Sequence, residues 1–292
     1  HTFITNHRDI VMDSAFLSIS LLDNGFGNTM EIAIGDNLLI RPWIKKLVRV
    51  DKAFIVQRSV SLRQMLASSA RLSRYMHYAI ATKHENIWIA QREGRAKDSN
   101  DRTQDSILKM MAMGGEGSII DRLKQLNLVP TALSYEYDPC DYLKAQEFQQ
   151  KRDIEGFKKS PKDDLVNMQT GIFGYKGRIC FRVAGPLNDW LDTLPADMPK
   201  TELFTAVASR IDKEIHRNYK LYAGNYVAAD LLRATKEFAA HYTSEEKTRF
   251  EAYLESRLEK VTLPNPDTVF LRERLLTMYA NPVFNYMAAR QE

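Results

Sequence analysis

Short runs of apolar and β-branched residues alternate with helically periodic segments from residue 1 to about residue 187. Each short run is rich in Ile, Val, Phe, Tyr or Thr, which are the residue types that strands favour. The pattern predicts strands at Thr2–Thr5, Met30–Ile34, Phe54–Gln57, Ile87–Ala90, Val129–Tyr135 and Arg178–Val183. Strands that alternate with helices build the layers of an α/β protein. We therefore expect an α/β fold with a mixed central sheet flanked by helices.

The segments between these runs carry apolar residues at helical spacing. They predict helices at Ile10–Leu22 and Ser61–Thr82. Two shorter helices are expected inside Gln104–Leu126, separated at Met113–Gly115 where two glycines break the pattern. The longest polar stretch, Gln146–Asp164, is expected to form a solvated helix and loop.

The strand pattern stops at Gly185-Pro186, and residues 199–292 show only helical periodicity. Four or five helices are expected there, with N-caps at Asn225, Thr243 and Asn281 and boundaries at Pro264, Pro266 and Pro282. The chain thus divides into an α/β domain over residues 1–198 and a helical C-terminal segment over 199–292. This segment either completes the core, dimerises or docks a partner. Because the sequence opens on His1 inside a domain-like pattern, we expect an N-terminal part of the protein to precede it.

Composition and charge narrow the class of protein. The 292 residues are 44% apolar and 27% charged, which excludes low complexity and wholesale disorder. A net charge of +4 is too mild to require a nucleic-acid partner, but it suits anionic substrates or an anionic membrane face. Cys140 and Cys180 show no metal-binding spacing, so we expect two reduced thiols in a cytoplasmic protein and no metal site. No apolar window reaches the ~18 residues of a membrane span, so any membrane contact is peripheral.

One segment mixes apolar and cationic residues at helical spacing. Arg41–Val50 contains the apolar residues Trp43, Ile44, Leu47 and Val48 and the cations Arg41, Lys45, Lys46 and Arg49. Such a helix either lies on an anionic bilayer or packs its apolar stripe on the sheet while its cations are solvated.

A histidine and two carboxylates follow the first predicted strand. His7 comes soon after Thr2–Thr5, with Asp9 and Asp13 following it. The carboxyl ends of parallel strands are where α/β sheets place ligands. A carboxylate that holds one imidazole nitrogen leaves the other free to take a proton from a hydroxyl. The alternative is that Asn6 or Asp9 caps the next helix and His7 is an ordinary surface residue.

Three other predicted strands carry candidate ligand-binding residues. A glycine beside cations at a strand end permits close approach of the backbone to a phosphate, although a tight turn with solvated charges has the same sequence. The candidates are Arg58 after the strand at 54–57, Glu93, Gly94, Arg95 and Lys97 after the strand at 87–90, and Pro130 in the strand at 129–135.

The order of these groups resembles the four motif blocks of the glycerolipid acyltransferases, the family of glycerol-3-phosphate and 1-acylglycerol-3-phosphate acyltransferases. The blocks are a His with a following Asp, a strand ending in Arg, a Glu-Gly with basic residues, and a Val-Pro that leads to Tyr-Glu. All four occur in family order over about residues 3–187. Lys52–Ser59 and Pro130–Glu136 are most similar to the glycerol-3-phosphate branch.

The resemblance implies an O-acyltransferase of phospholipid biosynthesis. A fatty acyl group would pass from an acyl thioester, on coenzyme A or acyl carrier protein, to the hydroxyl of glycerol-3-phosphate or, alternatively, of lysophosphatidic acid. No further cofactor is implied, and a lipid product suggests peripheral attachment to the cytoplasmic face of the inner membrane. The implied roles are His7 as base, Asp13 as its orienting partner, Arg58, Glu93, Gly94, Arg95 and Lys97 as acceptor-binding residues, and Pro130 as a structural or donor-binding residue.

Two departures from the family pattern matter. Five residues separate His7 from Asp13 where the family has four, so Asp13 faces His7 only if the loop before the helix is one residue longer. Asp9 is the fallback partner, and a non-catalytic lipid-binding or scaffold protein is the alternative that this spacing leaves open. In the third block Arg95 comes one residue early, so either Arg95 or Lys97 supplies the phosphate contact. No G-x-S-x-G pattern occurs, which favours direct attack by the acceptor hydroxyl.

Overall fold

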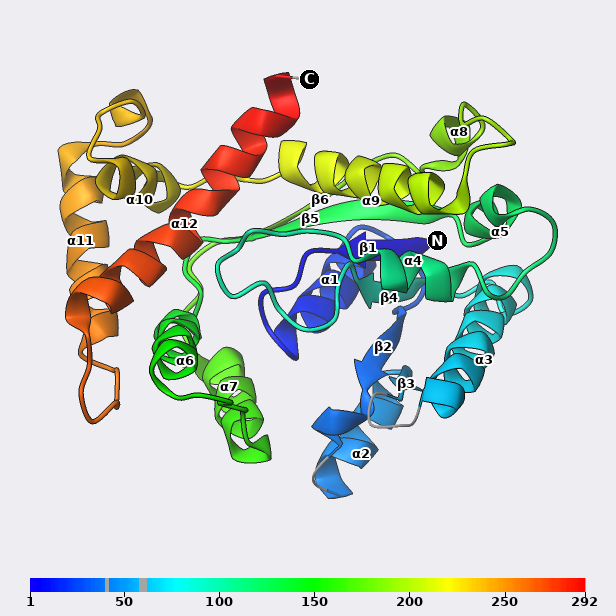
Figure 1. Cartoon of the computed structure of the whole chain (residues 1–292), viewed down its shortest axis with the longest axis horizontal. Helices are drawn as coiled ribbons and strands as arrows, with labels where there is room; N and C mark the ends of the chain where they lie inside the picture. The colour runs from blue at the N-terminus through cyan, green and yellow to red at the C-terminus, as the bar shows by residue number, and fades with distance from the viewer. Residues whose placement is uncertain (40–41, 58–61, 292) are drawn as a thin grey trace.

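The computed structural model describes residues 1–39, 42–57 and 62–291, and this part of the chain contains a six-stranded sheet (Figure 1). The strands are β1 (Thr2–Thr5), β2 (Glu31–Gly35), β3 (Ala53–Val56), β4 (Ile87–Ala90), β5 (Leu128–Tyr135) and β6 (Ile179–Val183). Their order across the sheet is β3-β2-β4-β1-β5-β6, with β1 to β5 parallel and β6 antiparallel to β5. The expected α/β fold with a mixed sheet is confirmed, and each predicted strand lies within one residue of its observed bounds.

In the described part of the chain, helices lie between the strands and directly after the last strand. They are α1 (Met12–Asp23), α2 (Pro42–Val50), α3 (Leu62–Ala81), α4 (Asp105–Met111), α5 (Ile119–Gln125), α6 (Asp141–Asp153), α7 (Pro161–Phe173) and α8 (Asn188–Leu191), with a 3-10 turn η1 (Asp36–Leu38) after β2. The predicted break at Met113–Gly115 separates α4 from α5, as expected. The helix predicted from Ile10 begins instead at Met12, and this difference matters for the site described below.

The two faces of the sheet pack against different helices. Successive side chains of a strand point to opposite faces, so Ile4 and Phe3 of β1 enter different cores. Ile4 belongs to the larger core, which includes residues of α3, α4, α5 and α9 (Lys200–Arg217). Phe3 packs in a smaller cluster with Leu17 and Leu21 of α1. The polar functional groups gather beyond the carboxyl ends of these strands.

The C-terminal residues are helical, as predicted. After α9 the elements are α10 (Ala223–Arg233), a 3-10 turn η2 (Ala239–His241), α11 (Ser244–Leu258) and α12 (Thr268–Gln291). α9 lies along β5 and buries Val207, Ile211 and Ile215 completely in the core of the sheet (Figure 1). α10, α11 and α12 form a separate apolar cluster that also takes in Ala145 of α6. The C-terminal segment was expected to complete the core, to dimerise or to dock a partner, and α9 completes the core.

Two of the predicted helix N-caps are wrong. Thr243 caps α11 as expected and accepts a hydrogen bond from Glu246 N at 3.1 Å. Asn225 lies inside α10, where its side-chain oxygen accepts from Tyr222 N at 2.9 Å. Asn281 and Pro282 lie inside α12, because Pro282 is accommodated within this long helix instead of ending it.

The remaining proline predictions hold. Pro264 and Pro266 lie between α11 and α12, at the expected boundary.

The basic segment at 41–50 forms α2, in which Ile44 is buried. Lys45, Lys46 and Arg49 are exposed, so among the described side chains of α2 the cations face solvent while Ile44 packs inward. Arg41 lies outside the described residues, as do the side chains of Trp43 and Leu47. Within the described residues, no helix combines the length and the apolar character that crossing a bilayer demands.

Candidate active site

His7 stands just beyond the carboxyl end of β1, and the side chain of Asn6 fixes its place. Asn6 donates to Leu133 O at 2.9 Å and accepts from Leu133 N at 2.8 Å, so it continues the pairing of β1 with β5 by one residue. The His7 ring meets Trp88 of β4 edge to face, with ring centroids 5.6 Å apart. His7 is therefore held at the strand end between two neighbouring strands.

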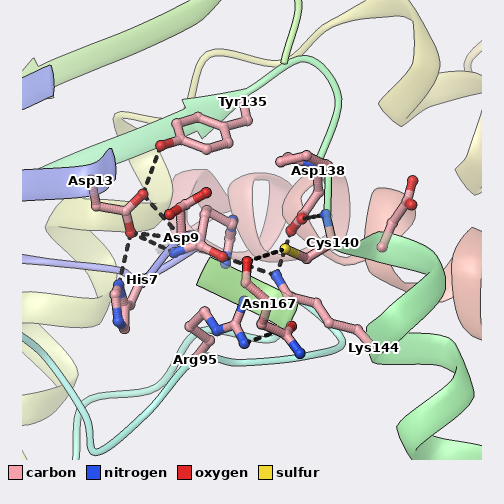
Figure 2. A network of polar contacts seen from close by, with 12 residues as sticks. His7, Asp9, Asp13, Arg95, Tyr135, Asp138, Cys140, Lys144 and Asn167 are labelled. Atoms are coloured by element: carbon pink, nitrogen blue, oxygen red, sulfur yellow. Dashed lines mark hydrogen bonds and ion pairs between the residues drawn. The ribbon is translucent and has the colours of Figure 1, made fainter. Parts of the chain in front are cut away.

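His7 and Asp13 are in contact despite their altered spacing (Figure 2). His7 Nδ1 lies 2.8 Å from Asp13 Oδ2. Because α1 begins at Met12, the loop before it is longer than the sequence pattern indicated, and Asp13 falls in the first helical turn facing back toward His7. Backbone N–H groups of Arg8 and Asp9 also donate to Asp13, at 2.7 and 3.1 Å. The sequence spacing required a longer loop before the helix if Asp13 was to face His7, and the structure has this longer loop.

Asp13 also binds Tyr135, whose hydroxyl donates to Oδ1 at 2.8 Å. Burial, together with the charges of Asp13 and Asp9, raises the pKa of Tyr135, so the phenol keeps its proton and acts as a donor. Asp13 thus accepts hydrogen bonds on both oxygens. His7 Nδ1 consequently carries the hydrogen that it shares with Asp13, which leaves Nε2 as the basic nitrogen. Among the described residues, no hydrogen bond engages His7 Nε2.

Asp9, the fallback partner, has a different task. Its Oδ1 accepts from Val11 N at 2.9 Å and from Met12 N at 3.0 Å, which caps the start of α1. Its Oδ2 is buried with no hydrogen-bond partner in the described structure. Burial and the charge of Asp13 raise the pKa of Asp9. Asp9 therefore shapes the loop, while Asp13 contacts the imidazole.

Two buried cations, Arg8 within this loop and Lys144 of α6, tie the loop to the surrounding structure. The Arg8 guanidinium pairs with Asp101 at 2.8 and 2.5 Å, and Tyr219, just after the end of α9, donates to the same carboxylate at 2.5 Å. Lys144 of α6 donates to Arg8 O at 3.1 Å and pairs with Asp138. The loop that carries His7 is thus fixed by α6, by the segment just after α9 and by the loop after β4.

His7 opens onto a cleft of about 760 Å³ between the sheet, α1, α2 and α7. Most of its wall is apolar, contributed by β2, α2, α7 and the loop before α1. Its polar members besides His7 are Ser14, Asp51 and Arg92. The apolar lining residues include Ile10, Val11, Ile32, Ile34, Leu38, Val48 and Met168. A basic nitrogen at the wall of an apolar cleft suits a substrate with a hydroxyl and a hydrocarbon portion.

The other candidate residues are only partly brought together. Gly94 lines the cleft with a φ of +69°, a conformation that favours glycine. Glu93 is exposed beside it, and its backbone N–H donates to Gln104 at 2.7 Å. Pro130 is buried inside β5, paired with Ile4, and is absent from the described lining of the cleft. Arg58 lies outside the described residues.

The two cations proposed for phosphate binding are both engaged elsewhere. Arg95 Nη2 donates to Asn167 of α7 at 3.0 Å (Figure 2). Lys97 Nζ lies 2.5 Å from Glu147 of α6, and burial lowers the pKa of this ammonium group. Neither side chain is part of the described lining of the cleft.

The sequence analysis missed two residues of this site, Tyr135 and Arg92. Arg92 lines the cleft two residues after β4, the same strand-end position that singled out Arg58. The strand-end signal was therefore present for Arg92. Tyr135 stood in the fourth motif block without a role of its own, because only the pairing of β5 with β1 brings it toward Asp13.

The described residues also bear on metal binding and on thiol activation. The described residues contain no group of three or more His, Cys, Asp or Glu side chains placed to hold a metal ion. Cys140 and Cys180 are both free, as expected. Burial raises the pKa of Cys140 to about 11, so its thiol stays protonated at neutral pH.

Comparison of the chain with models of protein families finds no match, and comparison with curated proteins finds none either. The geometry of the site is therefore what indicates the chemistry of this protein. That geometry is a histidine and aspartate pair at the end of β1, set in the wall of an apolar cleft.

Proposed function

We propose that this chain is an O-acyltransferase that moves a fatty acyl group from an acyl thioester to the hydroxyl of glycerol-3-phosphate. The observation that carries the proposal is the 2.8 Å contact between His7 Nδ1 and Asp13 Oδ2, which leaves Nε2 available at the wall of an apolar cleft. The sequence resemblance points to the same pair. The non-catalytic alternative drew on the altered spacing, and the contact shows that this spacing does not separate the two side chains.

The reaction needs one base and no covalent intermediate. His7 Nε2 takes the proton of the acceptor hydroxyl as its oxygen attacks the thioester carbonyl carbon. The tetrahedral intermediate then expels the thiolate, the carbon–sulfur bond breaks, and the imidazolium returns the proton to sulfur. Asp13 stabilises the imidazolium through Nδ1–H and holds the ring in orientation.

The apolar cleft supports a lipid substrate. Residues of β2, α2 and α7 give it a hydrocarbon-like wall, and burial of an acyl chain is favourable by about 0.8 kcal/mol for each methylene group. Cys140 is buried with a raised pKa, which supports direct transfer over an acyl-cysteine route.

The test is thiol release from palmitoyl-coenzyme A in the presence of glycerol-3-phosphate, with wild type, His7→Ala and Asp13→Asn. We expect acceptor-dependent release that falls by about 100-fold or more in His7→Ala, since general base catalysis contributes factors of about 10²–10⁴. Asp13→Asn should lose activity too, because the amide no longer stabilises the imidazolium.

His84→Asn provides a matched control. His84 is an exposed histidine with a φ of +55°, which asparagine tolerates, so this variant should keep full activity. Release that persists in His7→Ala would contradict the assignment of the base. Lysophosphatidic acid is run as a second acceptor, and a preference for it would correct the acceptor while leaving the reaction in place.

A further inference from the structure

The sheet divides beside the candidate site. The pairing of β2 with β4 ends at Ile32 and Trp88. Beyond that point β2 stays with β3 as far as Gly35, and β4 stays with β1 as far as Ala90. The carboxyl-terminal parts of β2 and β4 therefore diverge. Such a division between parallel strands is where α/β sheets accommodate ligands.

Two cavities on opposite sides of the sheet meet at this division. One is the cleft that contains His7. The other, of about 700 Å³, is lined mainly by residues of β3, β4, α3 and α4. The residues common to both linings are Ala33, Gly35, Ala90 and Arg92. Arg92 is the charged member of this shared set.

Arg92 has hydrogen-bonding capacity that the described protein does not use. Its Nε is buried without a hydrogen-bond partner among the described residues. Buried polar atoms without a partner are uncommon in folded proteins, because an unsatisfied donor loses its hydrogen bonds to water. The amide of Gln91, the residue before Arg92, is likewise buried without a hydrogen-bond partner among the described residues. A polar ligand in the cleft would accept a hydrogen bond from Arg92 Nε, which the described residues leave unpaired.

The chemistry of the guanidinium indicates which ligand. Its planar array of donors matches the oxygens of a phosphate and binds two of them at once. Lys97 forms an ion pair with Glu147, and Arg95 donates a hydrogen bond to Asn167; neither side chain is in the described lining of the cleft. Arg92 is left as the described cation that faces the same cleft as His7.

We propose that Arg92 binds the phosphate monoester of the acceptor, in place of Arg95 or Lys97, the two alternatives that the sequence suggested. The phosphate lies at the division between β2 and β4, and the acceptor hydroxyl is directed toward His7. The identity of the acceptor rests on the proposed function, whereas the phosphate site at Arg92 does not require that acyl transfer occur.

Binding is measured first, without any acyl donor. Isothermal titration with glycerol-3-phosphate, inorganic phosphate and glycerol is carried out on wild type, Arg92→Gln, Arg92→Lys and Arg95→Gln. Arg249→Gln is the matched surface control, since Arg249 is exposed on α11.

We expect Arg92→Gln to weaken glycerol-3-phosphate binding by at least about tenfold, in line with the loss of hydrogen bonds to a charged group. Arg92→Lys should retain part of the affinity, and Arg95→Gln and Arg249→Gln should bind within about twofold of wild type. Binding of inorganic phosphate that also depends on Arg92 would identify the phosphate as the recognised group, and glycerol should not bind.

Kinetics then separate the two proposals. With palmitoyl-coenzyme A, Arg92→Gln should raise KM for glycerol-3-phosphate by about tenfold or more and leave KM for the donor unchanged. Phosphate binding that depends on Arg92 without any acyl transfer would support the site and overturn the function. Acyl transfer with an unchanged acceptor KM in Arg92→Gln, or a loss found in Arg95→Gln instead, would overturn the assignment of Arg92 and leave the function standing. Absence of both binding and transfer in wild type would overturn both. Circular dichroism of each variant confirms that it is folded.

Discussion

The position of the Asp13 carboxylate is fixed by hydrogen bonds from several parts of the chain. The carboxylate receives hydrogen bonds from the imidazole of His7, from two backbone N–H groups of its own loop, and from Tyr135 on β5. A carboxylate held from several directions cannot rotate away from the imidazole, so orientation of His7 depends on all of these donors. Tyr135 is a positioning residue, because it acts through Asp13.

Tyr135→Phe removes one of these donors with little change in shape. We expect a loss of about 1–2 kcal/mol in the free energy of unfolding and a fall of about tenfold in kcat, with KM for the acceptor unchanged. The measurements are urea unfolding and thiol release. The matched control is Tyr253→Phe, which removes a 2.6 Å hydrogen bond to buried Asp141 away from the cleft. Tyr253→Phe should lose comparable stability and keep its kcat, and an equal loss of kcat in both variants would contradict a positioning role for Tyr135.

At the scale of elements, α7 packs closely on the loop that carries His7, and Gly171 is the residue of α7 at the point of contact. A Cβ placed on Gly171 would overlap the Asp9 carboxylate. That carboxylate cannot move aside easily, because it caps α1 through Val11 N and Met12 N. Met168, one turn earlier on α7, lines the cleft, so this close approach also sets the width of the site.

Gly171→Ala tests this packing against helix propensity. Alanine favours a helix over glycine by about 1 kcal/mol, whereas overpacking typically costs about 1–3 kcal/mol. We expect a net loss of stability and a lower kcat, measured by urea unfolding and thiol release. Gly185→Ala is the control, because a Cβ there meets open space and its backbone is not in the left-handed region. A Gly171→Ala variant as stable and as active as Gly185→Ala would show that α7 does not close the site in this way.

At the scale of the whole molecule, α9 joins the C-terminal helices to the segment after β4. Asp212 accepts from both the backbone N–H and the hydroxyl of Thr103 at 2.7 Å. His216 Nε2 donates to Asp101 O at 2.9 Å, and Asp101 pairs in turn with Arg8 beside His7. The site and the C-terminal segment therefore share one network of buried polar contacts.

This junction makes stability depend on pH in two opposite ways. Burial lowers the pKa of His216 to about 4, so the unfolded chain takes up the proton first and stability is lost as pH falls from about 6.5 toward 4. Burial raises the pKa of Asp212 to about 6, so the folded chain takes up the proton first and stability is gained as pH falls below 6. Between pH 7 and pH 4.5, His216→Gln should lose less stability than wild type and Asp212→Asn more, each by roughly 2 kcal/mol. Urea unfolding at both pH values measures the differences, and changes of the same sign in the two variants would refute the assignment.

The strands and most of the helices could be predicted from the sequence, because alternation and helical spacing are local signals. Thr2–Thr5 and Ile87–Ala90 were predicted with their observed bounds. Errors came where local rules met tertiary packing. Asn281 and Pro282 resemble a helix boundary, but α12 continues through both.

The candidate site was predicted in part. His7 and Asp13 were selected by residue type and order, and their catalytic roles stay predictions. The sequence could not show which cation faces the cleft. Lys97 pairs with Glu147 of α6 and Arg95 donates to Asn167 of α7, and both partners lie far along the chain. No local pattern reports such a contact.

The sequence by itself determined which segments become strands and helices, and it placed a histidine and an aspartate just after the first strand. The tertiary structure decided that α1 begins at Met12, which turns Asp13 toward His7. It also decided that β2 and β4 diverge beside Arg92, and that α9 covers the sheet. The physical reason is the distance along the chain over which each interaction acts. Helical periodicity and capping act between residues a few positions apart. The hydrogen bonds of this site join residues more than a hundred positions apart, such as Asp13 and Tyr135.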